Sequence, residues 1–346
     1  MSPEATTKSD PLPLHVQLIE MGTAAWVTMI IHGAAKIGLA DHIDREAKTA
    51  EQLAGPTGTH APSLGRLMRT LAALGLLTEG PAGHFSLTAL GEALKRGAPG
   101  AARSTILTLA GARFWRLLGE FPYSLETGKP AHMKTNDVPL FEWLARHPEE
   151  AALFSETMVG FHGREPDAVA AAYDFSQFAT LVDVGGATGH MLTTILKRYD
   201  GVRGVLFDLP HVEPDARELI SSRSLADRIS ICTGSFFDAV PRGGDVYLLS
   251  HVIHDWSEDQ CMTILQNCRR VMNRDGRLLI IEMVLPPGDT MHPGKILDML
   301  MLVGPGGQER SEQEYRTLLD KAGFRLTRVV PTESAVSVVE AVCTDR

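Results

Sequence analysis

The chain has 346 residues, enough for two domains or for one domain with a large extension. With 44% hydrophobic and 22% charged residues, its composition is typical of a globular protein with a sizeable core. The formal net charge of -9 argues against a nucleic-acid partner, because a polyanion binds to a positive surface. No apolar run reaches the roughly 18 residues that span a bilayer, so we expect no membrane partner.

The four cysteines predict a reducing compartment. They show no metal-binding spacing, so we expect reduced thiols, a cytoplasmic protein and no bound metal. Residues 1–13 are polar and contain prolines, without the apolar core of a signal peptide, and are predicted to be a disordered tail.

Residues 14–97 are predicted to be mostly helical. Thr49 is a candidate N-cap for a short helix, a longer helix covers residues 62–77, and the glycines and proline of residues 80–83 favour a tight turn. This succession of two helices and a hairpin is typical of a winged helix-turn-helix. A DNA-binding function is disfavoured because the second helix offers only Arg66 and Arg69 as phosphate contacts.

A glycine-rich turn follows a predicted buried strand at residues 181–190, which read LVDVGGATGH. Glycines let a ligand lie against bare backbone at the start of the following helix. Asp183 at the strand end would repel a phosphate and attract an ammonium group. The pattern therefore favours a ligand with an amino-acid head, of which S-adenosylmethionine is the common one. Asp208 ends the next predicted strand, where a Rossmann-type sheet places the acid that binds ribose hydroxyls.

Strands and helices alternate from Thr180 onward, as a doubly wound α/β sheet requires. Further strands are predicted over residues 229–232, 244–249 and 277–282, and two closing antiparallel strands over residues 326–330 and 336–342. Ligands bind at the carboxyl ends of the parallel strands in such sheets.

Five motifs in this order resemble one family. DVGGATG begins at Asp183, FDLP at Phe207, GSFF at Gly234, HVIHDW at His251 and GGQER at Gly306. Together they resemble the S-adenosylmethionine-dependent O-methyltransferases of the plant caffeic-acid and bacterial natural-product (hydroxyneurosporene) type. The resemblance implies a Rossmann-like class I methyltransferase sheet over residues 106–346. It also implies a winged-helix-like dimerisation domain over residues 14–105, and hence a homodimer.

The resemblance also implies a set of cofactor-binding residues. They are Asp183, Gly185, Gly186, Gly189, Asp208, Leu209, Ser235, Phe236 and Ser250. Phe236 should pack on the adenine ring. Ser235 departs from the family, which usually carries an aspartate there, and a hydroxyl is a weaker acceptor for the adenine amino group than a carboxylate.

His254 is the candidate general base. A phenol titrates near 10, so its proton must be removed for the oxygen to attack a sulfonium methyl group, and histidine suits that task. By resemblance, Glu282 and Glu309 orient the imidazole and stabilise its protonated form. The expected substrate is a small aromatic natural product with a hydroxyl, most simply a phenol.

Candidate substrate contacts come from three segments. They are Phe154, Met158, Phe161 and His162 in a helix that matches the family's Phe-x-x-x-Met pattern, Asp255 beside the base, and Met301. His251 is the better candidate for an ordinary buried histidine. Two alternatives stay open: a family member with other chemistry, such as C-methylation, hydroxylation or decarboxylation, and a winged-helix ligand-sensing regulator.

Overall fold

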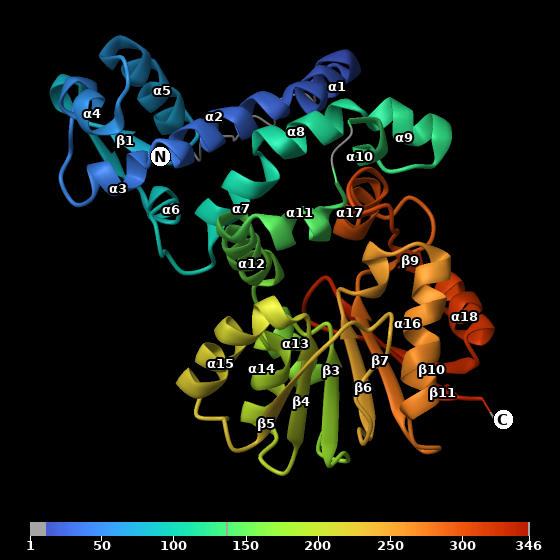
Figure 1. The fold of residues 1–346 in the computed structure, drawn as a ribbon. Helices are drawn as coiled ribbons and strands as arrows, with labels where there is room; N and C mark the ends of the chain where they lie inside the picture. Colours follow the sequence, from blue (N-terminus) through green and yellow to red (C-terminus); the bar gives the residue numbers. More distant parts are fainter. Residues whose placement is uncertain (1–11, 136–137, 345–346) are drawn as a thin grey trace, which may run out of the picture. The chain divides into compact units, whose positions relative to one another are not determined.

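The computed structural model describes residues 12–135 and 138–344, and the chain divides into two compact units at Ala112 and Arg113 (Figure 1). The tail predicted over residues 1–13 falls mainly outside the described residues. The compact sheet domain and the mainly helical first unit confirm the predicted fold class.

The first unit consists of helices and one small hairpin. Its elements are α1 (Leu14–Thr23), α2 (Ala25–Lys36), α3 (Leu39–Ile43), α4 (Ala50–Thr57), α5 (Ala61–Ala73), β1 (Leu77–Glu79), η1 (Pro81–Gly83), β2 (Phe85–Leu87), α6 (Ala89–Glu92) and α7 (Ala102–Leu109). Thr49 caps α4 with a capping box, and β1 pairs antiparallel with β2, so the expected order of helix, helix and hairpin is confirmed. The second helix ends at Ala73 rather than at residue 77, because Leu77 begins β1. Leu53, Met68 and Phe85 belong to the core of this unit.

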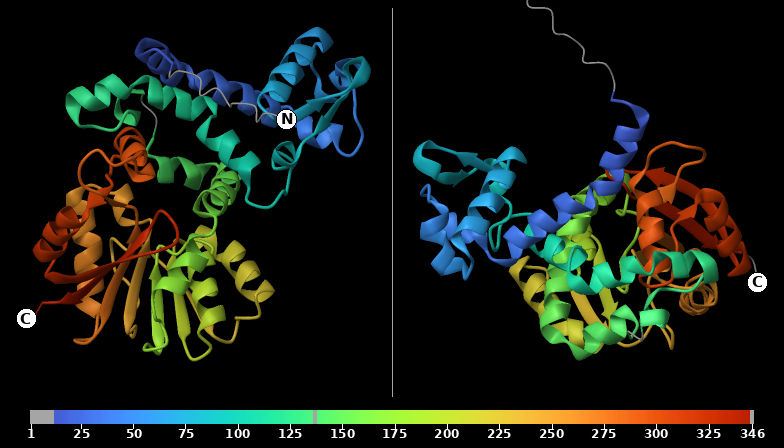
Figure 2. Two further views of the ribbon diagram at one scale, coloured as in Figure 1. Left: turned by 180° about the vertical axis from the view of Figure 1, so that it is seen from behind. Right: turned by 90° about the horizontal axis from the view of Figure 1, so that it is seen from above.

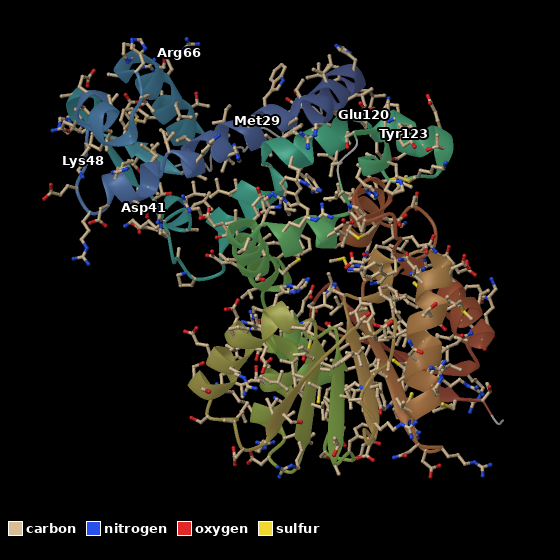
Figure 3. All side chains as sticks on the ribbon, in the orientation of Figure 1. Met29, Asp41, Lys48, Arg66, Glu120 and Tyr123 are labelled. Carbon is tan, nitrogen blue, oxygen red and sulfur yellow. The ribbon has the colours of Figure 1, made fainter. Side chains whose placement is uncertain are left out.

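The first two helices require a correction. The segment Leu14–Lys36 is long and apolar enough, by length and composition, to cross a membrane, although the sequence analysis expected no such segment. Its polar residues interrupt every apolar run, but the average over 18 residues remains apolar. None of the most apolar window is buried; Trp26 is 70% exposed, and Met29 projects from α2 (Figure 3).

Short helices open the second unit. They are α8 (Ala112–Gly119), α9 (Phe121–Thr127), α10 (His132–Thr135), α11 (Leu140–Arg146), α12 (Pro148–His162) and α13 (Glu165–Ala172). Gly163, in the left-handed region with φ of 48°, ends α12 and lets the chain turn into α13.

A seven-stranded sheet forms the body of the second unit. The strands are β3 (Thr180–Val184), β4 (Arg203–Asp208), β5 (Ile229–Thr233), β6 (Val246–Ser250), β7 (Arg277–Glu282), β10 (Phe324–Pro331) and β11 (Ser337–Cys343). Their order is β10-β11-β7-β6-β3-β4-β5. The five strands from β5 to β7 are parallel, whereas β11 and β10 close the sheet antiparallel, as predicted.

Helices cover both faces of the sheet (Figures 1 and 2). The other elements of this unit are α14 (His190–Arg198), α15 (Glu213–Ser222), α16 (Glu258–Val271), α17 (Pro293–Val303) and α18 (Glu312–Lys321), with η2 (Pro210–Val212), η3 (Ile253–Asp255) and the short strands β8 (Val284–Leu285) and β9 (Arg310–Ser311). Alternate residues of β3 enter different cores: Leu181 packs with α13, α14 and α15, whereas Val182 and Val184 pack with α16 and α18.

The strand order reverses at β3, because β4 lies on one side of it and β6 on the other. Such a switch point leaves a crevice at the carboxyl ends of the strands. The turn after β3 and the segments after β4, β5, β6 and β7 all meet this edge, so the candidate site residues gather there.

Candidate active site

Close packing determines the shape of the glycine turn after β3. Gly185 has φ of 73°, and a Cβ atom there would lie 2.9 Å from Cγ2 of Val252 and 3.3 Å from the Phe236 ring. A Cβ atom on Gly186 would lie 2.5 Å from a carboxylate oxygen of Asp183. Gly189, with φ of 86°, is the N-cap of α14. A side chain at Gly185 or Gly186 would therefore displace the neighbours that surround the turn.

Asp183 is a buried carboxylate without a partner. It is 0% exposed, and neither oxygen has a hydrogen-bond partner in the described part of the chain. Burial, and then the charge of Asp208, raise the pKa of Asp183 to about 7, against a smaller opposing effect of the Leu192 amide. A buried polar group without a partner needs an explanation, and a cationic ligand group beside the turn supplies one.

Asp208 links the end of β4 to the glycine turn. Its Oδ2 accepts the Ala187 N–H at 2.7 Å, and its Oδ1 accepts the Leu209 N–H at 2.6 Å. Burial raises the pKa of Asp208, while these backbone amides oppose the rise. Each oxygen keeps a further lone pair, so the carboxylate can still accept from a ligand hydroxyl.

Ser235 and Phe236 follow β5 on the same edge. The Ser235 hydroxyl accepts the Phe237 N–H at 3.2 Å, which uses part of its acceptor capacity within its own turn. The Phe236 ring lies between the glycine turn and Trp256, at 5.9 Å between ring centroids. Ser250, at the end of β6, pairs in register with Ile281 and lies at the same edge.

His254 lies in η3, directly after β6, and is 6% exposed. Its Nδ1 lies 2.6 Å from Oε1 of Glu309, and its Nε2 lies 3.7 Å from Oδ1 of Asp255. A Glu309 carboxylate therefore accepts the Nδ1 proton, which leaves the lone pair of the neutral ring on Nε2.

Glu282 contacts the backbone of His254 rather than its ring, which differs from the expected orienting role. Its Oε1 accepts the His254 N–H at 3.0 Å, and its Oε2 accepts a short hydrogen bond from the Tyr315 hydroxyl. The carbonyl of His254 in turn accepts the Gln308 N–H at 2.9 Å. The loop that carries the base is thus held from both sides, while Glu309 alone of the two glutamates bonds the imidazole.

The neighbouring carboxylates determine the protonation state of His254. Burial lowers the pKa of His254, but Asp255, the Glu309 hydrogen bond and the Glu282 charge outweigh it and raise that pKa to about 10. Burial raises the pKa of Asp255 to about 6, against the His254 charge. Burial likewise raises the pKa of Glu309. In the ligand-free protein His254 is therefore an imidazolium at neutral pH.

The residues predicted to contact the substrate differ in burial and in position. Phe154, Met158 and His162 lie four residues apart on one face of α12, and all three are partly buried. Phe161 is 40% exposed and contacts His162 edge-on. Met301, in α17, packs partly buried against the core on the α13 face of the sheet.

Among the residues that the structure describes, two groups of three side chains could hold a metal ion by proximity alone. They are His254 with Glu282 and Glu309, and His162 with Glu165 and His251. In the first group both oxygens of Glu282 and Oε1 of Glu309 already accept hydrogen bonds, whereas the buried Oε2 of Glu309 has no partner in the described part of the chain. The side chains of this first group are therefore arranged for the hydrogen bonds described above. The expected absence of a metal stays a prediction.

Two residues escaped the sequence analysis. Tyr315 follows the GGQER motif in α18, and its short hydrogen bond to Glu282 connects it with the site. Glu165 hydrogen-bonds His251 across 86 positions of the chain. His251 is buried, as expected of an ordinary core histidine, but it belongs to a polar cluster beside the base.

Comparison with known proteins identifies the class. Residues 117–325 match the O-methyltransferase domain, and residues 19–96 match the O-methyltransferase dimerisation domain. The chain therefore belongs to the S-adenosylmethionine-dependent O-methyltransferase family, with the dimerisation domain that accompanies this catalytic domain.

Relatives of known activity cover nearly the whole chain. Phenazine O-methyltransferase PhzM of Lysobacter antibioticus is 40% identical over 334 residues, which are 96% of this chain and 98% of the relative. The crystal structure of LaPhzM matches with a TM-score of 0.91 and 41% identity, covering 96% of this chain and 100% of that one. The O-methyltransferase NcsB1 from neocarzinostatin biosynthesis, solved with S-adenosylmethionine and 2-hydroxy-5-methyl naphthoic acid, matches with a TM-score of 0.83 and 31% identity, covering 97% of this chain and 100% of that one.

S-adenosylmethionine is the cofactor, and the residues present fit it. The unpartnered carboxylate of Asp183 suits the ammonium group, Asp208 keeps acceptor capacity for hydroxyls, and Phe236 offers a ring beside the glycine turn.

Proposed function

We propose that this enzyme methylates a phenolic hydroxyl of a small aromatic natural product and that His254 is the general base. The observation that carries the proposal is the buried pair of His254 Nδ1 and Glu309 Oε1 at 2.6 Å, which directs Nε2 away from the carboxylate. Bound S-adenosylmethionine supplies an electrophilic methyl group.

In the proposed mechanism, one proton moves from the substrate hydroxyl to His254. When His254 is neutral, Glu309 holds the proton on Nδ1, and Nε2 takes the proton of the hydroxyl as its oxygen becomes nucleophilic. The resulting imidazolium is stabilised by Glu309, Asp255 and Glu282. Because His254 and a simple phenol both titrate near 10, the proton passes between groups of matched affinity.

We assign the other predicted site residues to the cofactor or to the acceptor from their positions in the fold. Asp183, Gly185, Gly186, Gly189, Asp208, Leu209, Ser235, Phe236 and Ser250 would hold the cofactor, and Phe154, Met158, Phe161, His162, Asp255 and Met301 would contact the acceptor. The relatives reported above, one that methylates a phenazine and one solved with a naphthoic acid, support an acceptor of two or three fused rings.

Replacing His254 by Ala tests the base. We expect turnover of a methylated phenol to fall by about 10² to 10⁴, the usual contribution of general base catalysis, with affinity for S-adenosylhomocysteine unchanged in calorimetry. A variant that keeps full turnover would disprove the assignment. Loss of cofactor binding in the wild-type protein would instead disprove the proposed cofactor site.

We also propose a homodimer formed through residues 14–105, with residues 106–346 as the catalytic domain. The exposed side chains of α1 and α2, including Leu18, Met21 and Trp26, form an apolar surface that a partner subunit would cover. Trp26→Glu should shift the sedimentation of the protein toward the monomer. Leu125→Glu, an equally drastic change at a residue 61% exposed in α9, is the matched control. The thiols of Cys232, Cys261 and Cys268, which form no disulfide, support a cytoplasmic location.

A further inference from the structure

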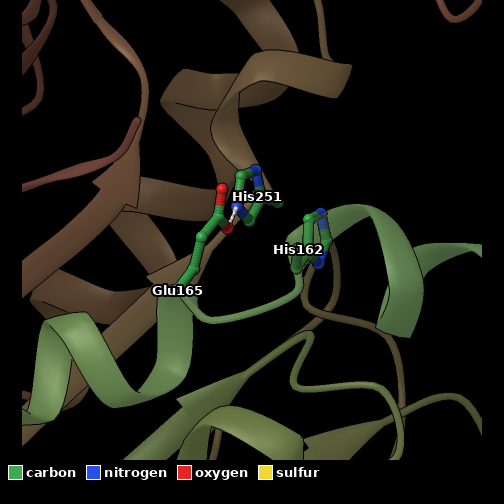
Figure 4. A group of neighbouring side chains, drawn as sticks. All are labelled: His162, Glu165 and His251. Atoms are coloured by element: carbon green, nitrogen blue, oxygen red, sulfur yellow. Dashed lines mark hydrogen bonds and ion pairs between the residues drawn. The ribbon is translucent and has the colours of Figure 1, made fainter. Parts of the chain in front are cut away.

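Three side chains from separate segments form a compact cluster next to the base (Figure 4). His162 ends α12, Glu165 begins α13, and His251 follows β6 in the left-handed region with φ of 52°. Oε2 of Glu165 lies 2.7 Å from Nε2 of His251. The His251 ring stacks on His162, with centroids 3.9 Å apart and planes at 8°, and its centroid is 5.3 Å from that of His254.

The cluster is poorly arranged for a metal ion, although its ligand atoms lie within 4.8 Å of one another. An imidazole binds a metal in its own ring plane at about 2.0–2.1 Å. Two stacked, nearly parallel rings share no such point, so His162 and His251 cannot bind one ion in this arrangement. The separation of 2.7 Å between Glu165 and His251 is that of a hydrogen bond.

His251 has one hydrogen bond left unmade. Its Nδ1 is buried and has no partner within residues 12–135 and 138–344. Burial and the nearby His254 hold the pKa of His251 well below its usual value, so the ring is neutral. An ionised Glu165 accepts the proton of Nε2, and Nδ1 then carries a lone pair. If Glu165 is protonated, it donates to Nε2 and Nδ1 carries the hydrogen.

A buried nitrogen without a hydrogen-bond partner, such as Nδ1 of His251, costs about 1–3 kcal/mol of stability. The left-handed backbone at His251 adds a second unfavourable feature at the same residue. Both are typical of a side chain that is held in place to meet a ligand.

We propose that Nδ1 of His251 binds a polar substituent next to the hydroxyl that His254 deprotonates, and that Glu165 is the residue that positions it. The inference rests on the proposed function of His254, whose ring is the neighbour of His251. The acceptor would then be an aromatic compound with a second hydroxyl or an amino group beside the reacting hydroxyl. With Glu165 ionised, Nδ1 accepts the hydrogen of that substituent.

Matched pairs of acceptors test this specificity. Suitable pairs are 3-amino-4-hydroxybenzoate with 4-hydroxybenzoate, and 2,3-dihydroxynaphthalene with 2-naphthol. The quantity measured is the ratio of kcat/KM within each pair, which a general structural defect does not change. We expect the wild-type enzyme to favour the disubstituted member by about tenfold or more, the effect of one hydrogen bond to a buried group.

Three variants separate the contributions. His251→Phe keeps the stack on His162 but removes both nitrogens, and should bring the ratio close to one. Glu165→Gln keeps the volume and a hydrogen bond to Nε2 but removes the charge that fixes the proton, and should lower the ratio by a smaller factor. His60→Phe, the same substitution at an exposed residue of the first unit, should leave the ratio unchanged.

The outcomes are distinguishable. An unchanged ratio in His251→Phe, or no preference in the wild-type enzyme, would overturn this inference and leave the proposed function intact. Weaker binding of S-adenosylhomocysteine by His251→Phe, with the ratio unchanged, would assign Nδ1 to the cofactor and also overturn it. No methylation of any pair by wild-type enzyme that binds the cofactor would overturn the proposed function and this inference with it.

Discussion

Nδ1 of His254 lies 2.6 Å from Oε1 of Glu309, although the two residues are 55 positions apart in the chain. The loop after β6 carries the histidine and the loop after α17 carries the glutamate, and Gln308 joins the two loops through its N–H to the His254 carbonyl. Because this pair is buried and surrounded by two further carboxylates, we expect its protonation to affect both activity and stability.

The raised pKa of His254 predicts an alkaline pH profile. For a phenol that titrates near 10, the productive pair of neutral imidazole and neutral phenol becomes about tenfold more populated per pH unit, up to about pH 10. We therefore expect kcat/KM to rise from pH 7 toward pH 10. A profile that is flat from pH 7 upward with such a phenol would contradict the raised pKa.

Folding stability should depend on the same proton. The pKa of His254 is raised in the folded protein above its ordinary value of 6.5, so the stabilisation is complete below about 6.5 and is lost as the pH rises through about 10. Urea unfolding of wild type and His254→Gln at pH 6 and pH 10 measures it. The difference in free energy of unfolding between the two proteins should shrink at the higher pH.

Glu309→Gln should lower kcat about a hundredfold or more while preserving the fold. The amide can still accept the Nδ1 proton, but it no longer stabilises the imidazolium, so the pKa of His254 falls. The rise of kcat/KM with pH should therefore level off at a lower pH than in wild type. An unchanged pH profile would show that Asp255 and Glu282 alone set the pKa. Glu312→Gln, an exposed change close by in the chain, is the control.

Asp183→Asn should separate stability from cofactor binding. Burial raises the pKa of Asp183 to about 7 from 3.8, so the ligand-free wild-type protein loses stability as the pH rises from about 4 to about 7. The asparagine variant lacks this charge and should be the more stable protein at pH 8. Its affinity for S-adenosylmethionine, measured by calorimetry, should fall about ten- to a hundredfold because a charge-assisted contact is lost. Equal affinities would remove Asp183 from the proposed cofactor site.

Gly307→Ala should displace His254, although Gly307 is not one of the residues proposed to contact the cofactor or the acceptor. A Cβ atom at Gly307 would lie 1.9 Å from the carbonyl oxygen of His254, so one of the two loops must move. We expect a loss of about 1–3 kcal/mol in the free energy of unfolding and a marked loss of kcat. Gly201→Ala, where nothing lies within 4 Å, should change neither quantity. Wild-type turnover in Gly307→Ala would show that the position of His254 tolerates this shift.

Local patterns were sufficient to predict much of this protein. The glycine turn, the acids at the ends of β3 and β4, and the N-cap at Thr49 are each encoded within a few residues. The Glu165–His251 contact could not be predicted in this way, because it depends on how α13 meets β6 and on the left-handed backbone at His251. The backbone role of Glu282 depends likewise on a loop turned back over β7, and no sequence spacing records that turn.

The unpartnered carboxylate of Asp183 beside the glycine turn also couples cofactor binding to the release of a proton. Near neutral pH a substantial fraction of Asp183 carries a proton in the ligand-free protein. A cation seated beside this group favours its ionised form, so loading the enzyme expels that proton into the solvent. The heat of binding should therefore change with the ionisation enthalpy of the buffer, and acidification should favour release of the cofactor.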